Sequence, residues 1–203
     1  KKLVDLAKRA NIKHFVFISS RTAGYYSGAY GLSKLTAEHY IQKELSSWLI
    51  FRPSEVFGVS KNEGIEELIK NVLNKPYVLC PTQVESPMYP VFLGDVVRIM
   101  HDYTFEKMVE NQTITINGDH GYSFKEVIQL TQKISKRNVL ILPVPKFAMM
   151  MVQKMGDKFI AKLGIAPDQI ARLYSAKLTQ KLSYDLYSLE EYIVSLVDKE
   201  QKK

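Results

Sequence analysis

Tyr30 and Lys34 have the residue types and the spacing of a proton-transfer pair. Residues four apart on a helix lie on one face, with their β-carbons about 5–6 Å apart. An ammonium group beside a phenol favours the phenolate, so such a phenol can exchange a proton with a substrate hydroxyl or carbonyl while hydride moves to or from a nicotinamide. Ser19 and Ser20 end a predicted strand, and either could hydrogen-bond the same substrate oxygen.

The Tyr-x-x-x-Lys pattern alone is weak evidence. The chain has 12 tyrosines, and about one such match is expected by chance. Tyr103 and Lys107 form a second match at a predicted helix end with no Ser-Ser strand before it, which we interpret as a surface coincidence. Tyr30 differs because it follows a buried strand over residues 14–18 and begins a helix over residues 29–44.

The remaining elements predict an α/β chain that alternates helices with buried strands. The helix over 29–44 joins the strand over 14–18 to a second apolar strand, so the two should pair in parallel through a helical crossover. We expect Asp95 to N-cap a helix, and Ser123 with Glu126 to form a capping box. Beyond these, the pattern predicts helices over 3–10, 65–73, 96–103 and from 124, strands over 48–51, 89–92 and 113–116, a loop around Pro76, Pro81 and Pro87, and a mainly helical chain after Pro145, with one helix starting at Pro167.

Composition limits the class of protein without naming a partner. Apolar residues make up 46% of the 203-residue chain and charged residues 24%, which is typical of a globular domain and excludes wholesale disorder. A single cysteine, Cys80, excludes an internal disulfide framework and is expected to be a buried structural thiol in a reducing, cytoplasmic setting. The four histidines lack metal spacing, and we predict no metal site. The net charge of +7 favours anionic partners, but no motif predicts specific nucleic-acid binding.

Several segments together resemble one enzyme superfamily. The stretch over 14–20 is similar to the active-site strand of extended and atypical short-chain dehydrogenases/reductases, the NAD-dependent epimerase/dehydratase-like group. Residues 30–38 resemble its catalytic helix, and 51–58 the strand end beside nicotinamide and substrate. Further similar segments lie at 89–97, 116–126, 142–145 and 167–170. The pattern most resembles the atypical subfamily that contains the nucleotide-binding accessory subunit of respiratory complex I.

This resemblance implies roles for particular residues. Tyr30 would be the acid/base, Lys34 its ammonium partner and ribose ligand, and Ser20 or Ser19 the donor to the substrate oxygen. The resemblance further implies cofactor contacts at Pro53 and Val56 and substrate contacts at Thr22 and Glu55. Glu55 stands where sugar-modifying members usually have Asn. The implied cofactor is NAD or NADP, whose Gly-rich binding loop would precede Lys1.

The resemblance also implies a division of the chain. Residues 1–144 would be the C-terminal part of a Rossmann-type NAD(P)-binding domain, with a cleft insertion at about 60–88. Residues 145–203 would form a smaller, mainly helical region for substrate or partner.

The stretch over 145–163 has two interpretations. Phe147, Met150, Met151 and later apolar residues follow helical spacing among lysines. We favour a helix that covers the chain's own substrate cleft; the alternative is a basic amphipathic helix against a protein partner or an anionic membrane surface.

The implied activity is that of an NAD(P)-dependent oxidoreductase or epimerase-like enzyme acting on a small hydroxyl or carbonyl substrate. The alternative is a non-catalytic NAD(P)H-binding accessory protein that works through a partner or membrane.

Overall fold

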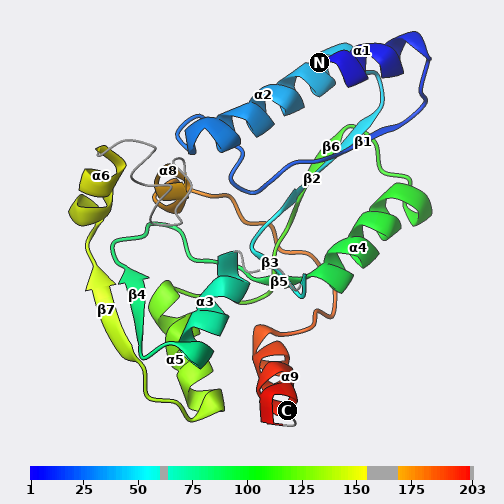
Figure 1. Ribbon diagram of the computed structural model, residues 1–203. Helices are drawn as coiled ribbons and strands as arrows, with labels where there is room; N and C mark the ends of the chain where they lie inside the picture. The colour runs from blue at the N-terminus through cyan, green and yellow to red at the C-terminus, as the bar shows by residue number, and fades with distance from the viewer. Residues whose placement is uncertain (60–63, 155–168, 202–203) are drawn as a thin grey trace.

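A three-stranded parallel sheet forms the first half of the fold in the computed structural model, which describes residues 1–59, 64–154 and 169–201. The strand order is β1-β2-β6, and both pairings are parallel (Figure 1). The strands are β1 (Phe15–Ile18), β2 (Trp48–Pro53) and β6 (Gln112–Ile116). Helix α2 (Gly28–Glu44) connects β1 to β2, so the predicted α/β class and its parallel crossover are confirmed.

Helices cover both faces of this sheet because the residues of β2 alternate in direction. Ile50 points toward α1 (Lys2–Arg9) and α2, where it packs with Val4 and Ile41. Leu49 and Phe51 point the other way and pack with residues of α4 (Leu93–His101). The sheet is therefore a central layer between helices, as a Rossmann-type sheet requires.

A buried ion pair attaches α2 to the sheet. Arg52 of β2 donates from Nε to Oε1 of Glu38 at 2.9 Å, and Nη2 contacts the second carboxylate oxygen. The Glu38 side chain is 1% exposed, so this contact fixes the helix where water cannot compete.

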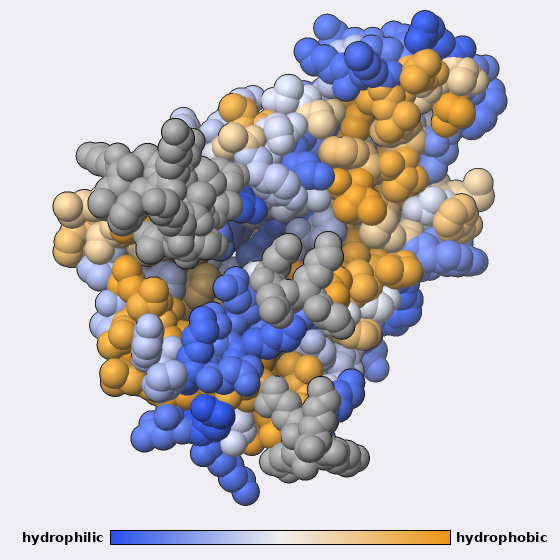
Figure 2. All heavy atoms as spheres, viewed as in Figure 1, coloured by the Kyte–Doolittle hydropathy of each residue, from blue (hydrophilic) through white to orange (hydrophobic). Residues whose placement is uncertain are grey.

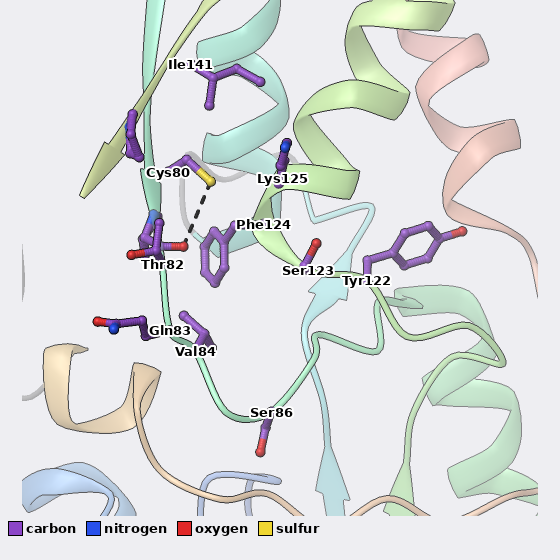
Figure 3. A pocket seen from close by; sticks show the side chains of 12 residues that line it. Cys80, Thr82, Gln83, Val84, Ser86, Tyr122, Ser123, Phe124, Lys125 and Ile141 are labelled. Carbon is purple, nitrogen blue, oxygen red and sulfur yellow. Dashed lines mark hydrogen bonds between the residues drawn. The ribbon is translucent and has the colours of Figure 1, made fainter. Parts of the chain in front are cut away.

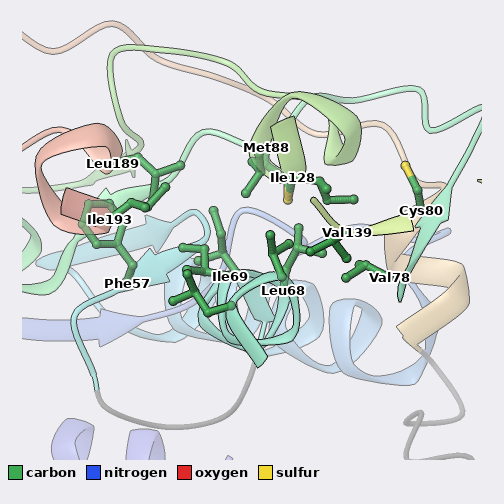
Figure 4. Close-up of a cluster of buried hydrophobic side chains, with 14 of the residues drawn as sticks. Phe57, Leu68, Ile69, Val78, Cys80, Met88, Ile128, Val139, Leu189 and Ile193 are labelled. Carbon is green, nitrogen blue, oxygen red and sulfur yellow. The ribbon is translucent and has the colours of Figure 1, made fainter. Parts of the chain in front are cut away.

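The helices α3, α5 and α9, which lie below the sheet in the view of Figure 1, contribute to a second hydrophobic cluster. It is built by segments far apart in sequence, and Phe57, Ile69, Ile128 and Ile193 lie at its centre with no exposed surface (Figure 4). The elements that supply it are α3 (Gly64–Asn74), β4 (Tyr77–Pro81), α5 (Phe124–Ser135), β7 (Leu140–Val144) and α9 (Leu189–Gln201).

Short elements complete the described part of the chain. They are the β3 (Val56–Phe57) and β5 (Val91–Phe92) pair, the π-helical turn η1 (Asp102–Glu106), α6 (Lys146–Lys154) and α8 (Gln169–Leu173). The predicted strand over 89–92 is thus limited to its last two residues.

The predicted loop around Pro76 and Pro81 was wrong. Residues 77–81 form β4, which pairs in parallel with β7. Proline suggested a loop, but each strand of a two-stranded sheet has a free edge at which a missing N–H costs little. Side chains of β4 alternate between exposed and buried, with Val78 and Cys80 inside, so the predicted burial of Cys80 is confirmed.

One further prediction about a helix was wrong. Asp95 does not cap α4, because the helix begins at Leu93; its carboxylate accepts instead from Arg98 at 2.7 Å and from the backbone N–H of Tyr187 at 2.8 Å. The described chain after Pro145 is helical in α6, α8 and α9, whereas residues 174–188 contain no helix. They run along the sheet and α4, where Leu182 is buried. Pro167 lies outside the described residues.

The capping boxes illustrate local sequence control. Ser123 accepts from the N–H of Glu126 at 3.2 Å, and the Glu126 carboxylate accepts from the N–H of Ser123 at 2.7 Å, as predicted. Ser188 and Glu191 repeat the arrangement before α9. Each pair satisfies backbone donors that a helix start leaves open.

Candidate functional site

Ser19 and Ser20 lie at the carboxyl end of β1, where the backbone continues to hydrogen-bond with β2. The N–H of Ser19 donates to the carbonyl of Phe51 at 2.7 Å, and that of Arg21 to the carbonyl of Pro53 at 2.9 Å. Ser20 shares a 2.9 Å hydrogen bond with the hydroxyl of Thr22. The Ser19 hydroxyl is buried and has no hydrogen-bond partner among the described residues.

Lys34 joins the catalytic-helix candidate to this strand end. Its Nζ donates to the carbonyl of Ile18, the residue before Ser19, at 3.0 Å. The same nitrogen lies 5.7 Å from the centre of the Tyr30 ring. Tyr30 is 40% exposed, so its ring is accessible from outside. Lys34 therefore binds the end of β1 that carries the two serines and lies near the Tyr30 ring.

Gly31 allows the start of α2 to approach the loop after β1. A β-carbon at this position would lie 2.4 Å from the carbonyl oxygen of Thr22 and 2.3 Å from the β-carbon of Ser27. The carbonyl of Gly31 accepts from the N–H of Gly24 at 3.2 Å. The residue after Tyr30 must therefore lack a side chain for this helix to lie where it does.

Glu55, a predicted substrate contact, is held by the protein itself. Its two carboxylate oxygens accept from Nη2 of Arg21 at 3.0 and 2.9 Å, and one also accepts from the N–H of Tyr89 at 3.0 Å. Burial would raise the pKa of Glu55, but Arg21, Lys177 and the Tyr89 N–H outweigh it and hold the pKa below its ordinary value. Glu55 is a partly buried anion that pairs with Arg21 and Lys177.

Two cations near the candidate residues come from the C-terminal part of the chain, and sequence reasoning missed both. Nζ of Lys177 lies 3.6 Å from Glu55, and its side chain is 7% exposed. The guanidinium of Arg172, on α8, lies 5.0 Å from the centre of the Tyr30 ring. The local sequence offers no signal for either residue, because their approach depends on the path of the chain after residue 168.

The two predicted cofactor contacts flank the same region. Pro53 ends β2, and its carbonyl receives the N–H of Arg21. Val56 is half-buried in β3 and pairs with Val91 of β5. Both therefore follow the carboxyl end of β2, the neighbour of β1 in the sheet.

The second Tyr-x-x-x-Lys pair lies in a different environment. Lys107 makes a 2.8 Å ion pair with Asp102, and its Nζ lies 4.5 Å from the centre of the Tyr103 ring. Hydrogen bonds to Asp102 and Tyr184 raise the pKa of Lys107 above its ordinary value, which keeps its charge fixed. The contacts of Lys107 and Asp102 with Tyr184 attach η1 to the C-terminal part of the chain. Unlike Tyr30, Tyr103 does not follow a strand that ends in serines.

A cavity of about 470 Å³ lies between the β4–β7 sheet and the start of α5. Cys80, Thr82, Phe124 and Lys125 line it, and Figure 3 shows these residues around an open space. Burial raises the pKa of the Cys80 thiol, so the thiol stays protonated. Ser86 also lines the cavity, and its hydroxyl accepts from the N–H of Lys177 at 3.0 Å, which places the cavity next to Lys177.

The described residues were also compared with the requirements of a metal site and of a membrane-spanning helix. Within residues 1–59, 64–154 and 169–201, no group of metal-ligating side chains is close enough to hold an ion. No helix of those same ranges is long and apolar enough to cross a membrane. In α6, Phe147 and Met151 are exposed, while Met155, Phe159 and Leu163 of the predicted amphipathic stretch lie outside the described residues.

Solved structures of other proteins share the fold of this chain. No protein-family model matches the sequence, and no curated protein matches it. A nucleoside-diphosphate-sugar epimerase from Staphylococcus aureus superposes with a TM-score of 0.71 at 14% identity, over 95% of this chain and 68% of that one. The UDP-glucose 4-epimerase of Thermus thermophilus, in complex with NAD, gives 0.57 at 18% identity, over 85% and 66%. A UDP-glucuronic acid 4-epimerase from Bacillus cereus, also with NAD, gives 0.58 at 18% identity, over 85% and 61%.

The chain has the Rossmann-type fold of these epimerases. It spans about two thirds or less of the length of several of them. In this Rossmann-type sheet Ser19, Ser20 and Pro53 lie at the carboxyl ends of adjacent parallel strands, where ligands of open α/β sheets bind.

Proposed function

We propose that this chain supplies the proton-transfer and substrate-contacting residues of an NAD(P)-dependent oxidoreductase or epimerase-like short-chain dehydrogenase/reductase. The observation that carries the proposal is the position of Lys34, whose Nζ bonds to the carbonyl of Ile18 and lies 5.7 Å from the Tyr30 ring. One cation thus connects the phenol to the strand end where the serines lie. The fold shared with NAD-bound epimerase structures supports the cofactor class.

The residues present fit the nicotinamide-ribose end of such a cofactor. The buried Ser19 hydroxyl lacks a partner in the described structure, and Lys34 has hydrogen-bonding capacity beyond its one bond to Ile18. Lys34 would hold a ribose hydroxyl, and Pro53 with Val56 would lie against the nicotinamide. When bound, the nicotinamide supplies the site that accepts or returns a hydride.

The chain's own residues would manage the proton and the substrate oxygen. Tyr30 would take the proton from a substrate hydroxyl as it becomes a carbonyl, or return it in the reverse direction. The positive charge of Lys34 would stabilise the phenolate between these steps. Ser19 or Ser20 would donate a hydrogen bond to the reacting oxygen and orient it, with Thr22 holding the Ser20 hydroxyl at 2.9 Å.

The test uses the full natural chain with NAD(H) or NADP(H) and a panel of small alcohols and carbonyls. Replacement of Tyr30 by Phe should lower hydride transfer, followed by nicotinamide absorbance, by about 100-fold or more. Cofactor affinity, measured by fluorescence titration, should change little. Tyr103→Phe is the matched control, because Tyr103 belongs to the second Tyr-x-x-x-Lys pair, and it should keep full activity.

Two results would redirect the proposal. Equal turnover in Tyr30→Phe and the unmodified protein would remove Tyr30 from the chemistry. Tight cofactor binding with no turnover by the unmodified protein would instead favour a non-catalytic accessory protein, as in the atypical subfamily that the sequence resembles.

A further inference from the structure

The cavity between the β4–β7 sheet and the start of α5 has no part in the proposed proton transfer. Its volume of about 470 Å³ lies within the range of about 300–1,000 Å³ that is typical of small-molecule sites. Phe124 and Val84 face the open space from two sides (Figure 3). The Cys80 thiol, which is protonated because burial raises its pKa, is only weakly polar. These side chains suit an apolar occupant.

The sheet that forms one wall of the cavity is apolar on both faces. Ile141 and Pro143 of β7 line the cavity and pair in register with Val78 and Cys80 of β4, which are buried. Residues paired in register share a face of the sheet. On the outside, Figure 2 shows hydrophobic surface gathered over β4 and β7 at the left of the view. This wall therefore offers a ligand apolar contact and few hydrogen bonds.

Two polar side chains at the cavity already have partners in the protein. Oγ1 of Thr82 donates to the carbonyl of Val144 at 3.3 Å, which extends the pairing of β4 with β7. Oε1 of Gln83 accepts from the N–H of Lys146 at 3.2 Å and so holds the start of α6. Both side chains are placed by the needs of the fold.

The two serines of the lining are engaged in the same way. The Ser86 hydroxyl accepts from the N–H of Lys177 at 3.0 Å. The Ser123 hydroxyl accepts from the N–H of Glu126 at 3.2 Å as part of the capping box of α5. Each hydroxyl thus satisfies a backbone donor of the protein.

Little polar capacity is left for a ligand. Lys125 is the only charged side chain among the described residues that line the cavity, and it is exposed, so its ammonium stays hydrated. The Tyr122 ring extends away from the open space (Figure 3). A sugar or a nucleotide would lose hydrogen bonds to water on entry and regain few of them, whereas an apolar group has none to lose.

A series of contacts joins the cavity wall to the candidate site. Lys177, whose N–H binds Ser86, also pairs through Nζ with Glu55 at 3.6 Å. Glu55 in turn accepts from Arg21, the residue after Ser20. The cavity and the serine-bearing end of β1 are therefore linked through two ion pairs, close enough in the fold to serve one substrate.

We infer that this cavity binds an apolar group about the size of one or two aromatic rings, and that the group is the unreactive part of the substrate on which Tyr30 acts. The inference rests on the proposed function and narrows its substrate class to alcohols and carbonyls with an apolar body. Removal of apolar surface from water, on the ligand and on the cavity wall, supplies the binding free energy.

The first experiment measures binding by calorimetry to the full natural chain with its cofactor present. The probes are 2-naphthylmethanol, glucose and UDP-glucose, and 2-naphthylmethanol should bind at least about tenfold more tightly than either of the others. Val84→Phe places a larger side chain in the open space and should weaken this binding about tenfold or more. Val97→Phe, the same substitution at a position of α4 that is 58% exposed, is the matched control and should leave the binding unchanged.

The second experiment uses Cys80 of the unmodified protein as a reporter, because its thiol lines the cavity. Its reaction with N-ethylmaleimide is followed by mass spectrometry of the peptide that contains it. At ten times its Kd, 2-naphthylmethanol should slow this reaction about tenfold, because only the unoccupied cavity leaves the thiol accessible. Glucose and UDP-glucose at the same concentration should not slow it. This measurement does not depend on whether Val84→Phe folds.

The outcomes separate this inference from the proposed function because binding needs no turnover. Protection of Cys80 by 2-naphthylmethanol that persists in Tyr30→Phe supports the apolar site even if no alcohol is oxidised. Equal or better protection by glucose or UDP-glucose, protection by none of the probes, or an equal loss of binding in Val84→Phe and Val97→Phe overturns it.

Turnover tests the link to the substrate. Where 2-naphthylmethanol is oxidised, Val84→Phe should raise its KM about tenfold or more with little change in kcat, because the variant removes binding that ground state and transition state share. An unchanged KM would overturn the assignment of the cavity to the substrate.

Discussion

Lys34 and Lys177 have the same side chain but contribute differently to the candidate site. Lys34 donates to a backbone carbonyl at the end of β1, within reach of Tyr30. Lys177 is buried beside Glu55, Arg21 and Arg172, where its charge is less favourable than in water. The helical spacing of Tyr30 and Lys34 could be predicted from sequence because it is local, whereas nothing local marked Lys177.

The lowered pKa of Lys177 predicts an unusual effect on stability. Near neutral pH, Lys177→Met should unfold at the same temperature as the unmodified protein or at a higher one, because burial disfavours the charge that the variant removes. Above the lowered pKa, the folded protein binds fewer protons than the unfolded chain. The unmodified protein should therefore gain stability relative to the variant as pH rises toward the ordinary value of 10.5.

Thermal unfolding followed by circular dichroism at several pH values measures this difference. Lys181→Met, four residues later and exposed, is the matched control and should show no such pH-dependent gap. A large drop in unfolding temperature for Lys177→Met near neutral pH would mean that its contact with Glu55 is net stabilising, which contradicts the expectation that burial makes this charge unfavourable.

At the scale of elements, α2 owes its position to two kinds of contact. The Arg52–Glu38 pair fixes its middle to β2, and the absence of a side chain at Gly31 lets its first turn lie against residues 22–27. The sequence indicated the helix correctly within a residue, but it could not show that Gly31 is a point of close approach. That depends on the fold of the preceding loop.

Gly31→Ala should destabilise the protein even though Ala favours helix by about 1 kcal/mol over Gly. The added carbon would lie 2.4 Å from the carbonyl oxygen of Thr22, which is backbone and cannot easily move. We expect a net loss of about 1–3 kcal/mol in the free energy of unfolding, measured by urea denaturation.

Gln42→Ala on the exposed face of the same helix is the control, with an expected change of about 0.5 kcal/mol or less. Because Gly31 adjoins Tyr30, Gly31→Ala should also reduce turnover. A stabilised variant with full activity would show that the loop over 22–27 does not pack against α2 in solution.

At the scale of the whole molecule, the last helix completes a core begun more than half the chain earlier. Leu189, Ile193 and Val197 of α9 pack with Phe57 and with residues of α3 and α5 (Figure 4). The Tyr192 hydroxyl also donates to the buried carboxylate of Glu66 at 2.9 Å. The C-terminal segment is therefore an integral part of the fold.

Ile193→Ala should lower the free energy of unfolding by about 2–5 kcal/mol, because the side chain is fully buried and its removal leaves a cavity. Val194→Ala is the matched control, since the adjacent residue is 41% exposed and should change stability by about 0.5 kcal/mol or less. Chemical denaturation measures both. Similar small effects for the two variants would mean that α9 does not pack on this core.

The sequence alone determined the features that depend on neighbours in the chain. Apolar runs predicted β1 and β2, the capping residues predicted the start of α5, and the four-residue spacing placed Tyr30 and Lys34 on one face. Such patterns are local because helix and strand periodicities extend over only a few residues.

Only the tertiary structure decided which distant residues meet. Strands β4 and β7 pair although their prolines suggested loops. Asp95 accepts a hydrogen bond from the N–H of Tyr187 instead of capping α4. Arg172 lies against the Tyr30 ring, and Lys177 pairs with Glu55. No local pattern encodes these contacts, because they depend on how the whole chain packs its apolar surfaces and compensates the charges that it buries.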